Sequence, residues 1–212
     1  MTTLTAADAY RLRPFLDALL RMDAQAPLLL ADRAGTLTAL TCPPSDVVVA
    51  IPLSAPAAPW VSALGERAVS AAALRTALGS ARDPLPDGLV CDPADLTPVA
   101  APALTVQPPV GPWLPGERGL AGDVRRLVTP DRTAAPRGSA PATGAADGVW
   151  GGLPRAAILT ALALGLLSHP ASRVTSGTCE RWKRLATPEG AVHIRPTGML
   201  RWTPAVLPGG AV

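Results

Sequence analysis

The chain has 212 residues, 25 of them proline and 19 glycine, and a net charge of +3 at pH 7. Its length suffices for one large or two small domains with a hydrophobic core. The three cysteines, Cys42, Cys91 and Cys179, lie far apart, which argues against a disulfide framework and favours a reducing compartment. The N-terminus shows no signal-peptide pattern and the apolar run 156–167 is too short to cross a membrane, so we expect a soluble, cytoplasmic protein without a membrane partner.

The first 128 residues are predicted to form an α+β body, in which helices accompany a small antiparallel sheet. Residues 5–23 are expected to be its first helix, because leucines recur there at helical spacing. Thr5 followed by Asp8 fits a capping box at the start of this helix. Pro14 is expected either to kink the helix or to lie in the first turn of a shorter one, since proline lacks the backbone N–H group.

Apolar segments of the body are predicted as strands. Residues 27–31 and 36–41 should pair as antiparallel strands, because a short glycine-containing turn joins them. Residues 47–53 are continuously apolar and rich in valine, which is typical of a central strand covered on both faces. A short helix should then begin after Ser70, its N-cap, and end before Gly79.

Proline is frequent in residues 82–116, and we expect extended, mostly irregular chain there, because proline suits neither helices nor central strands. Residues 104–107 are predicted as an edge strand within this segment, and residues 120–128 as a short helix. Residues 129–149 contain almost no large apolar side chain, which predicts a flexible linker or surface loop.

Residues 150–204 are predicted to form a C-terminal module of a buried helix and a basic β-hairpin, followed by a tail at 205–212. The module carries seven Lys and Arg side chains against two acidic ones, whereas the residues before it are slightly acidic. Its helix should start with Leu153 and Pro154 and extend to Leu167. Because that helix is apolar on all sides, we expect it to be buried.

A β-hairpin is predicted after this helix, with strands at 180–187 and 191–196 around the turn Pro188-Glu189-Gly190. If Thr187 pairs with Ala191, the alternation of side chains defines two faces. The face that would pack on the helix contains Trp182, Arg184, Ala186, Val192 and Ile194. The opposite face would present Arg181, Lys183, Leu185, His193 and Arg195 to solvent.

The candidate residues for binding an anionic partner are therefore Arg181, Lys183, His193 and Arg195. Clustered cations attract phosphate groups without any contact that reads a base. The alternative interpretation is that a half-exposed hairpin needs a polar face, and that arginine fills this face in a chain with a single lysine. The sequence leaves both interpretations open.

No residue pattern indicates catalysis, and we predict no catalytic, cofactor-binding or metal-binding residue. His169 and His193 lie in no ligand-like spacing with cysteine or carboxylate side chains. The predicted hairpin register keeps His193 away from Cys179, so a thiol–imidazole pair is not expected. The glycines of residues 116–123 lack the lysine and hydroxyl residues of a phosphate-binding loop.

Three functions stay open at the level of the sequence. The preferred hypothesis is a non-catalytic cytoplasmic protein that docks on another protein as a regulator, adaptor or chaperone-like accessory. The alternatives are a nucleic-acid-associated protein that uses the basic face of residues 180–196, and an enzyme of unrecognised type. The sequence predicts neither the identity of a partner nor the oligomeric state.

Overall fold

The computed structural model of the chain describes residues 3–45, 47–56, 68–79, 89–90, 96–129 and 148–196. Within these residues nine strands form one antiparallel sheet, which four α-helices accompany, so the fold class is α+β as predicted. The strands follow one another across the sheet in the order β7 (Pro98–Val99), β5 (Ala68–Ser70), β2 (Pro27–Arg33), β3 (Thr36–Thr41), β4 (Val47–Pro56), β11 (Gly190–Ile194), β10 (Trp182–Thr187), β9 (Arg173–Cys179) and β8 (Leu114–Leu120). A separate two-stranded sheet joins β1 (Thr3–Leu4) to β6 (Leu89–Val90).

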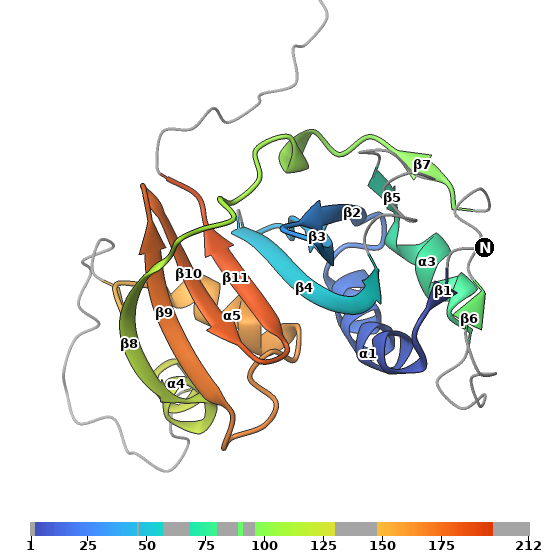
Figure 1. The fold of residues 1–212 in the computed structure, drawn as a ribbon. Coiled ribbons are helices and arrows are strands. Elements are labelled where there is room, and N and C mark those ends of the chain that lie inside the picture. The colour runs from blue at the N-terminus through green and yellow to red at the C-terminus, as the bar shows by residue number, and fades with distance from the viewer. Residues whose placement is uncertain are drawn as a thin grey trace, which may run out of the picture.

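Two units of the same pattern make up the large sheet. Helix α1 (Ala6–Met22) leads into the meander β2–β3–β4, and α5 (Arg155–Ala163) leads into the meander β9–β10–β11. A strand that runs directly into a helix extends each meander: β5 with α3 (Ala71–Ala77) lies beside β2, and β8 with α4 (Ala121–Val128) lies beside β9. Figure 1 shows the two units side by side.

The two units are joined by antiparallel pairing of β4 with β11, in which Ala191 lies opposite Ala50. The C-terminal hairpin therefore extends the sheet that the first strands begin. The division into a body of residues 1–128 and a module of residues 150–204 stays a prediction. Most of the predicted linker, at residues 130–147, and the whole predicted tail lie outside the described residues.

The sheet separates two apolar layers, as β4 illustrates. Val47, Val49 and Ile51 contribute to the main core, which contains buried side chains of all four helices. Val48 and Ala50 contribute to a smaller cluster on the opposite face of the sheet. Successive side chains of a strand point to opposite faces, so a continuously apolar strand supplies both layers. This confirms the prediction of a central strand covered on both sides.

Helix α1 begins with the predicted capping box. The Thr5 Oγ1 atom accepts a hydrogen bond from the Asp8 backbone N–H at 3.0 Å, and an Asp8 carboxylate oxygen accepts one from the Thr5 backbone N–H at 3.4 Å. The helix then continues through Pro14 to Met22, so the predicted alternative of a shorter helix beginning at Pro14 is wrong. Burial of the apolar helix face, including Leu12 and Leu16, offsets the hydrogen bond that Pro14 cannot donate.

The predicted hairpin of β2 and β3 is confirmed, with a turn of two residues. Ala34 and Gly35 both have positive φ, at 54° and 82°, and the Asp32 carboxylate accepts a hydrogen bond from the Gly35 N–H at 2.6 Å. The predicted Ser70 cap is also confirmed, since its Oγ atom accepts a hydrogen bond from Ala73 N–H at 3.3 Å. The predicted helix at residues 120–128 corresponds to α4.

The edge strand predicted at residues 104–107 is wrong. The chain instead forms a short 3-10 helix, η2 (Pro102–Leu104), in which the Ala101 carbonyl accepts a hydrogen bond from the Leu104 N–H at 2.9 Å. Pro102 stands at the first position of this turn, where its fixed φ suits a helix start and its missing N–H costs nothing.

Helix α5 is shorter than predicted and begins one residue later. Pro154 is its N-cap rather than its first helical residue, and the helix ends at Ala163 with Leu164 as C-cap. Gly165 follows with φ of 80°, in the left-handed region that commonly ends a helix. Leu166 and Leu167 are buried in the main core beyond this turn. The pattern that predicted one long apolar helix therefore combined a helix with the turn after it.

The C-terminal hairpin exists, but its register differs by one residue from the prediction. Thr187 pairs with Gly190 rather than with Ala191, so the loop contains only Pro188 and Glu189. The Thr187 Oγ1 atom accepts hydrogen bonds from the N–H groups of Glu189 and Gly190, at 3.2 and 3.3 Å, and so stabilises this tight loop.

The shifted register exchanges the faces of the second strand. Leu185 now lies opposite Val192, and both are fully buried on the side of the helices. Arg184 lies opposite His193, on the other side of the sheet with Trp182. Because a slip of one residue moves every side chain of a strand to the other face, the predicted basic face of the hairpin is not formed.

Candidate functional site

Residues 98–113, here called the strap, cross the face of the sheet opposite the four described α-helices (Figure 1). The strap begins with β7, which pairs with β5, and its buried Leu104 packs among side chains of β2, β3 and β4. Arg33 at the end of β2 holds it in place, because its Nη1 atom donates to Gln107 Oε1 at 2.8 Å and its Nη2 atom to the Pro108 carbonyl. Arg195 also donates to the Ala103 carbonyl.

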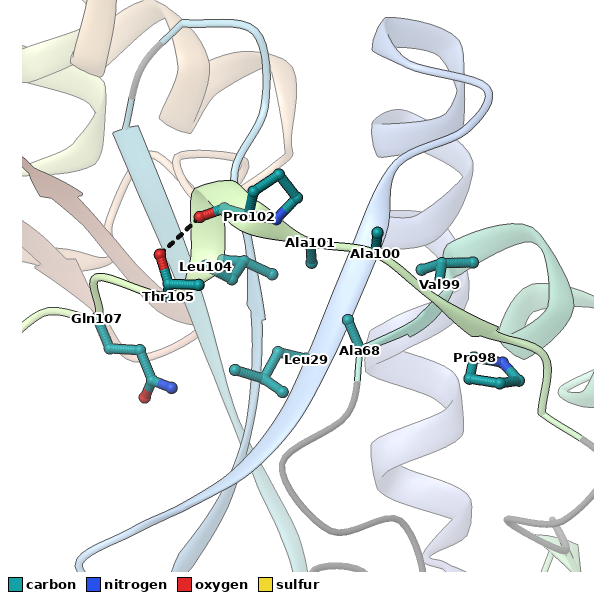
Figure 2. Close-up of a pocket in the computed structure, with 10 residues that line it drawn as sticks. All are labelled: Leu29, Ala68, Pro98, Val99, Ala100, Ala101, Pro102, Leu104, Thr105 and Gln107. Carbon is teal, nitrogen blue, oxygen red and sulfur yellow. Dashed lines mark hydrogen bonds between the residues drawn. The ribbon is translucent and has the colours of Figure 1, made fainter. Parts of the chain in front are cut away.

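An apolar hollow of about 820 Å³ lies between the first part of the strap and the sheet. Figure 2 shows Leu29 and Ala68 on the sheet side and Ala101 and Leu104 on the strap side. The hollow is lined by Leu29, Ala68, Pro98, Val99, Ala100, Ala101, Pro102, Leu104, Thr105 and Gln107. Only the last two of these side chains are polar, and the Thr105 hydroxyl already donates to the Pro102 carbonyl at 2.7 Å.

A second hollow, of about 310 Å³, lies between the later part of the strap and strands β3, β4, β10 and β11. We call it the cationic hollow, because Arg33 and Arg184 line it together with His193 and Trp113. The Arg184 guanidinium lies 4.6 Å from the centre of the Trp113 ring, in cation–π geometry. The His193 ring lies 5.2 Å from the same Trp113 ring at a tilt of 49°.

The electrostatics of the cationic hollow follow from burial and from the two arginines. His193 is only 5% exposed. Its pKa falls from 6.5 to about 3, because burial disfavours the imidazolium and because the charges of Arg184 and Arg33 oppose it. Burial also lowers the pKa of both guanidinium groups, although arginine stays charged at neutral pH. At pH 7 the hollow thus contains two positive charges and a neutral imidazole.

The structure separates the four residues that the sequence predicts as a basic surface. Arg181 is exposed in the turn between β9 and β10, and Lys183 is exposed, with its Nζ atom donating to the Gly152 carbonyl at 2.8 Å. His193 is buried, and the half-buried Arg195 binds the strap. Their role in binding an anionic partner stays a prediction, but these four side chains do not share one exposed face.

Of the residues in the cationic hollow, the sequence analysis named His193 as a candidate but missed Arg33, Trp113 and Arg184. Arg33 was assigned to a turn, Trp113 to an irregular proline-rich segment, and Arg184 to a face packed on a helix. The signal that was available is the pair of aromatic and cationic side chains Trp182 and Arg184, which do share one face of β10, as the predicted hairpin placed them. Their partners come from segments far away in the chain, which no local pattern indicates.

A third hollow, of about 690 Å³, lies on the helix side between α1 and the end of α5. Exposed Tyr10, Arg11 and Arg21 line it from α1, and His169 and Glu189 from the turns around the second meander. Arg11 donates to the Pro52 carbonyl at 3.0 Å and so bridges α1 to β4. The wall of this hollow thus combines positively and negatively charged side chains with apolar ones.

No group of three or more His, Cys, Asp or Glu side chains among the described residues is placed to hold a metal ion. No helix that the structure describes has the length and apolar character needed to span a membrane.

Comparison with known proteins shows a likeness in fold alone. The sequence matches no protein-family model and no curated protein. The structure is similar to a DNA polymerase sliding clamp from Pseudomonas aeruginosa with ligand, at a TM-score of 0.50 and 17% identity, over 99% of this chain and 69% of the clamp. A second structure of the clamp from that organism gives a TM-score of 0.50 and 14% identity, over 98% and 67%. A third, a DnaN sliding clamp (DNA polymerase III subunit beta) bound to griselimycin, gives 0.51 and 15%, over 99% and 69%.

Proposed function

We propose that this chain is a non-catalytic docking protein, and that an apolar segment of a partner protein occupies the hollow under the strap. The observation that carries the proposal is the lining of that hollow, in which eight of the ten described residues are leucine, valine, alanine or proline. Leu29, Ala68 and Leu104 form the buried floor of the hollow. Pro98, Ala100 and Pro102 are exposed at its rim, and such apolar surface is unfavourable in water and common in binding sites. A partner that places two or three large apolar side chains there would remove this surface from water.

The shape of the site favours an extended peptide segment. The hollow lies between a strap of irregular chain and a rigid sheet, and Arg33 and Leu104 fix the strap to that sheet. The Gln107 side-chain NH₂ group, whose neighbouring Oε1 atom accepts from Arg33, offers a polar contact for the backbone of such a segment. The likeness in fold to sliding clamps, two of which are described with a ligand or with griselimycin, supports a site for ligands on this architecture.

A random peptide display tests this proposal directly. Peptides selected on the whole protein should share large apolar residues at short spacing, and their affinity is then measured by fluorescence polarisation. Ala101→Trp, which fills the hollow from the strap, should weaken binding by at least about tenfold, or about 1.4 kcal/mol. Ala156→Trp on the exposed side of α5 is the matched control and should bind as the wild type does. Equal affinities of the two variants would refute docking under the strap.

A second candidate function, association with nucleic acid, is favoured by the fold likeness to DNA polymerase sliding clamps. Arg181 and Lys183 are the exposed members of the predicted anion-binding set. The double variant Arg181→Glu and Lys183→Glu should lower DNA affinity and reduce its dependence on salt. Arg126→Glu on α4 provides a comparison with an exposed cation elsewhere. DNA affinity that neither variant alters would remove this candidate.

A cytoplasmic location belongs to the same proposal. It rests on the small number of cysteines, of which Cys179 is buried and forms no disulfide in the structure. An enzyme of unrecognised type stays the third hypothesis, and no catalytic residue is assigned to it.

A further inference from the structure

We propose that the cationic hollow binds an oxyanion, a carboxylate or phosphate group carried by a small molecule with an apolar body. The hollow and its ligand are distinct from the apolar hollow and the peptide segment that would dock there. The proposal therefore stands without the docking function and is tested without a peptide.

The charge of the hollow is the first argument. Arg33 and Arg184 are both half-buried, and the charge of each acts on the buried His193 ring. The ion pairs of the described chain join Arg75 to Asp17 and Arg126 to Asp123, so neither arginine of the hollow is paired with a carboxylate there. Two partly desolvated cations without a counter-charge favour the binding of an anion.

Polar atoms that lack a partner are the second argument. His193 is 95% buried, and its Nδ1 atom makes no hydrogen bond among the described residues, although the ring lines the hollow. The buried Nε atom of Arg184 has no hydrogen-bond partner there either. Buried polar groups are almost always hydrogen-bonded, and a guanidinium matches the geometry of a carboxylate or phosphate. An oxyanion bound beside the Arg184 guanidinium would supply the negative charge that this half-buried cation lacks within the described chain.

The walls of the hollow indicate the rest of the ligand. The Trp113 ring, the two prolines Pro108 and Pro109 of the strap, and Leu40 and Ala50 of the sheet provide apolar contacts around the two charges. A volume of about 310 Å³ exceeds that of a free inorganic ion and suits a small organic anion. The Trp113 ring presents a flat surface, so an aromatic or planar body would gain most.

Thermal unfolding in the presence of defined anions tests the proposal. Inorganic phosphate, phenyl phosphate and benzoate are titrated at constant ionic strength, with chloride as the balancing ion, and the midpoint temperature Tm gives an apparent Kd. We expect Tm to rise with phenyl phosphate or benzoate at lower concentration than with inorganic phosphate. A rise with inorganic phosphate alone would overturn the assignment of an apolar body, and no rise above chloride with any anion would overturn the site.

Variants separate this role from a structural one. Arg184→Gln should weaken anion binding by at least about tenfold, as expected for a lost charge-assisted hydrogen bond, and Arg184→Lys should weaken it less. Arg181→Gln, which removes an exposed cation of the same hairpin, should bind as the wild type does. If Arg184 only stacks on Trp113, Arg184→Gln would lower the Tm of the anion-free protein but leave the anion-dependent rise in Tm unchanged. That result would refute the proposal.

His193→Phe is a second variant for the case that Arg184→Gln does not fold. It keeps a ring of similar shape against Trp113 and removes both nitrogen atoms, while both arginines remain. The proposal predicts weaker anion binding in this variant by several-fold. An unchanged apparent Kd in His193→Phe, together with an unchanged one in Arg184→Lys, would contradict the assignment of these groups to the site.

Discussion

Acidification from pH 7 to pH 5 should destabilise this protein through His193. Burial and the charges of Arg184 and Arg33 lower the pKa of this residue in the folded state to about 3, whereas an unfolded chain returns it to about 6.5. Between these two values the unfolded state binds more protons, so the free energy of unfolding falls as the pH falls. With these pKa values, the loss from pH 7 to pH 5 that is due to His193 is about 2 kcal/mol.

Urea unfolding at pH 7 and pH 5, in chloride buffer, measures this loss. His193→Gln removes the titrating group, so its loss of stability between the two pH values should be about 2 kcal/mol smaller than that of the wild type. His169→Gln is the matched control, because His169 is the other histidine and lies exposed on the surface. If His193→Gln lost as much stability as the wild type between pH 7 and pH 5, the burial of a neutral imidazole under the strap would be refuted.

Two further substitutions test the joint between the units and the cap of α1. Gly190→Ala should lower the free energy of unfolding by about 1–3 kcal/mol in urea titrations, because a Cβ atom there would lie 2.6 Å from the Ala50 carbonyl oxygen of β4. Gly119→Ala, whose Cβ atom would lie 3.6 Å from Trp150, should cost less, and equal losses would argue against the pairing of β4 with β11. Asp8→Ala should cost about 2 kcal/mol or more, since the buried Asp8 carboxylate accepts from Thr5 Oγ1 at 2.7 Å and from Ser54 N–H at 2.6 Å. Asp23→Ala removes an exposed local bond to Gln25 N–H and should cost less, so a larger loss there would contradict the assigned role of Asp8.

Elements with local signals could be predicted from the sequence. The Thr5–Asp8 capping box, the Ser70 cap and the turn at Gly35 each act over a few residues, and the helices and strands beside them lie where their signals predict. The valine-rich segment of β4 was also recognisable, because a strand buried on both faces needs apolar residues at every position.

Elements decided by long-range contacts could not be predicted. The hairpin register depends on the Thr187 hydroxyl and on the close approach of Gly190 to the Ala50 carbonyl of β4, and β4 lies about 140 residues earlier in the chain. The end of α5 depends on Gly165, but the apolar residues after it fitted the helical period equally well. Proline in the strap removes periodicity altogether, so nothing in the sequence indicated that Trp113 would lie against Arg184 and His193.

A partner segment that docks in the apolar hollow under the strap would cover both the strap and the sheet beside it. Hydrogen–deuterium exchange of the whole protein, with and without a display-selected peptide, tests this claim most directly. Docking under the strap should slow exchange in strap residues 99–107 and in the neighbouring β5, residues 68–70, and leave exchange in α4 and α5 unchanged. Protection confined to α4, α5 or the turn at Arg181, with no change in the strap, would contradict it.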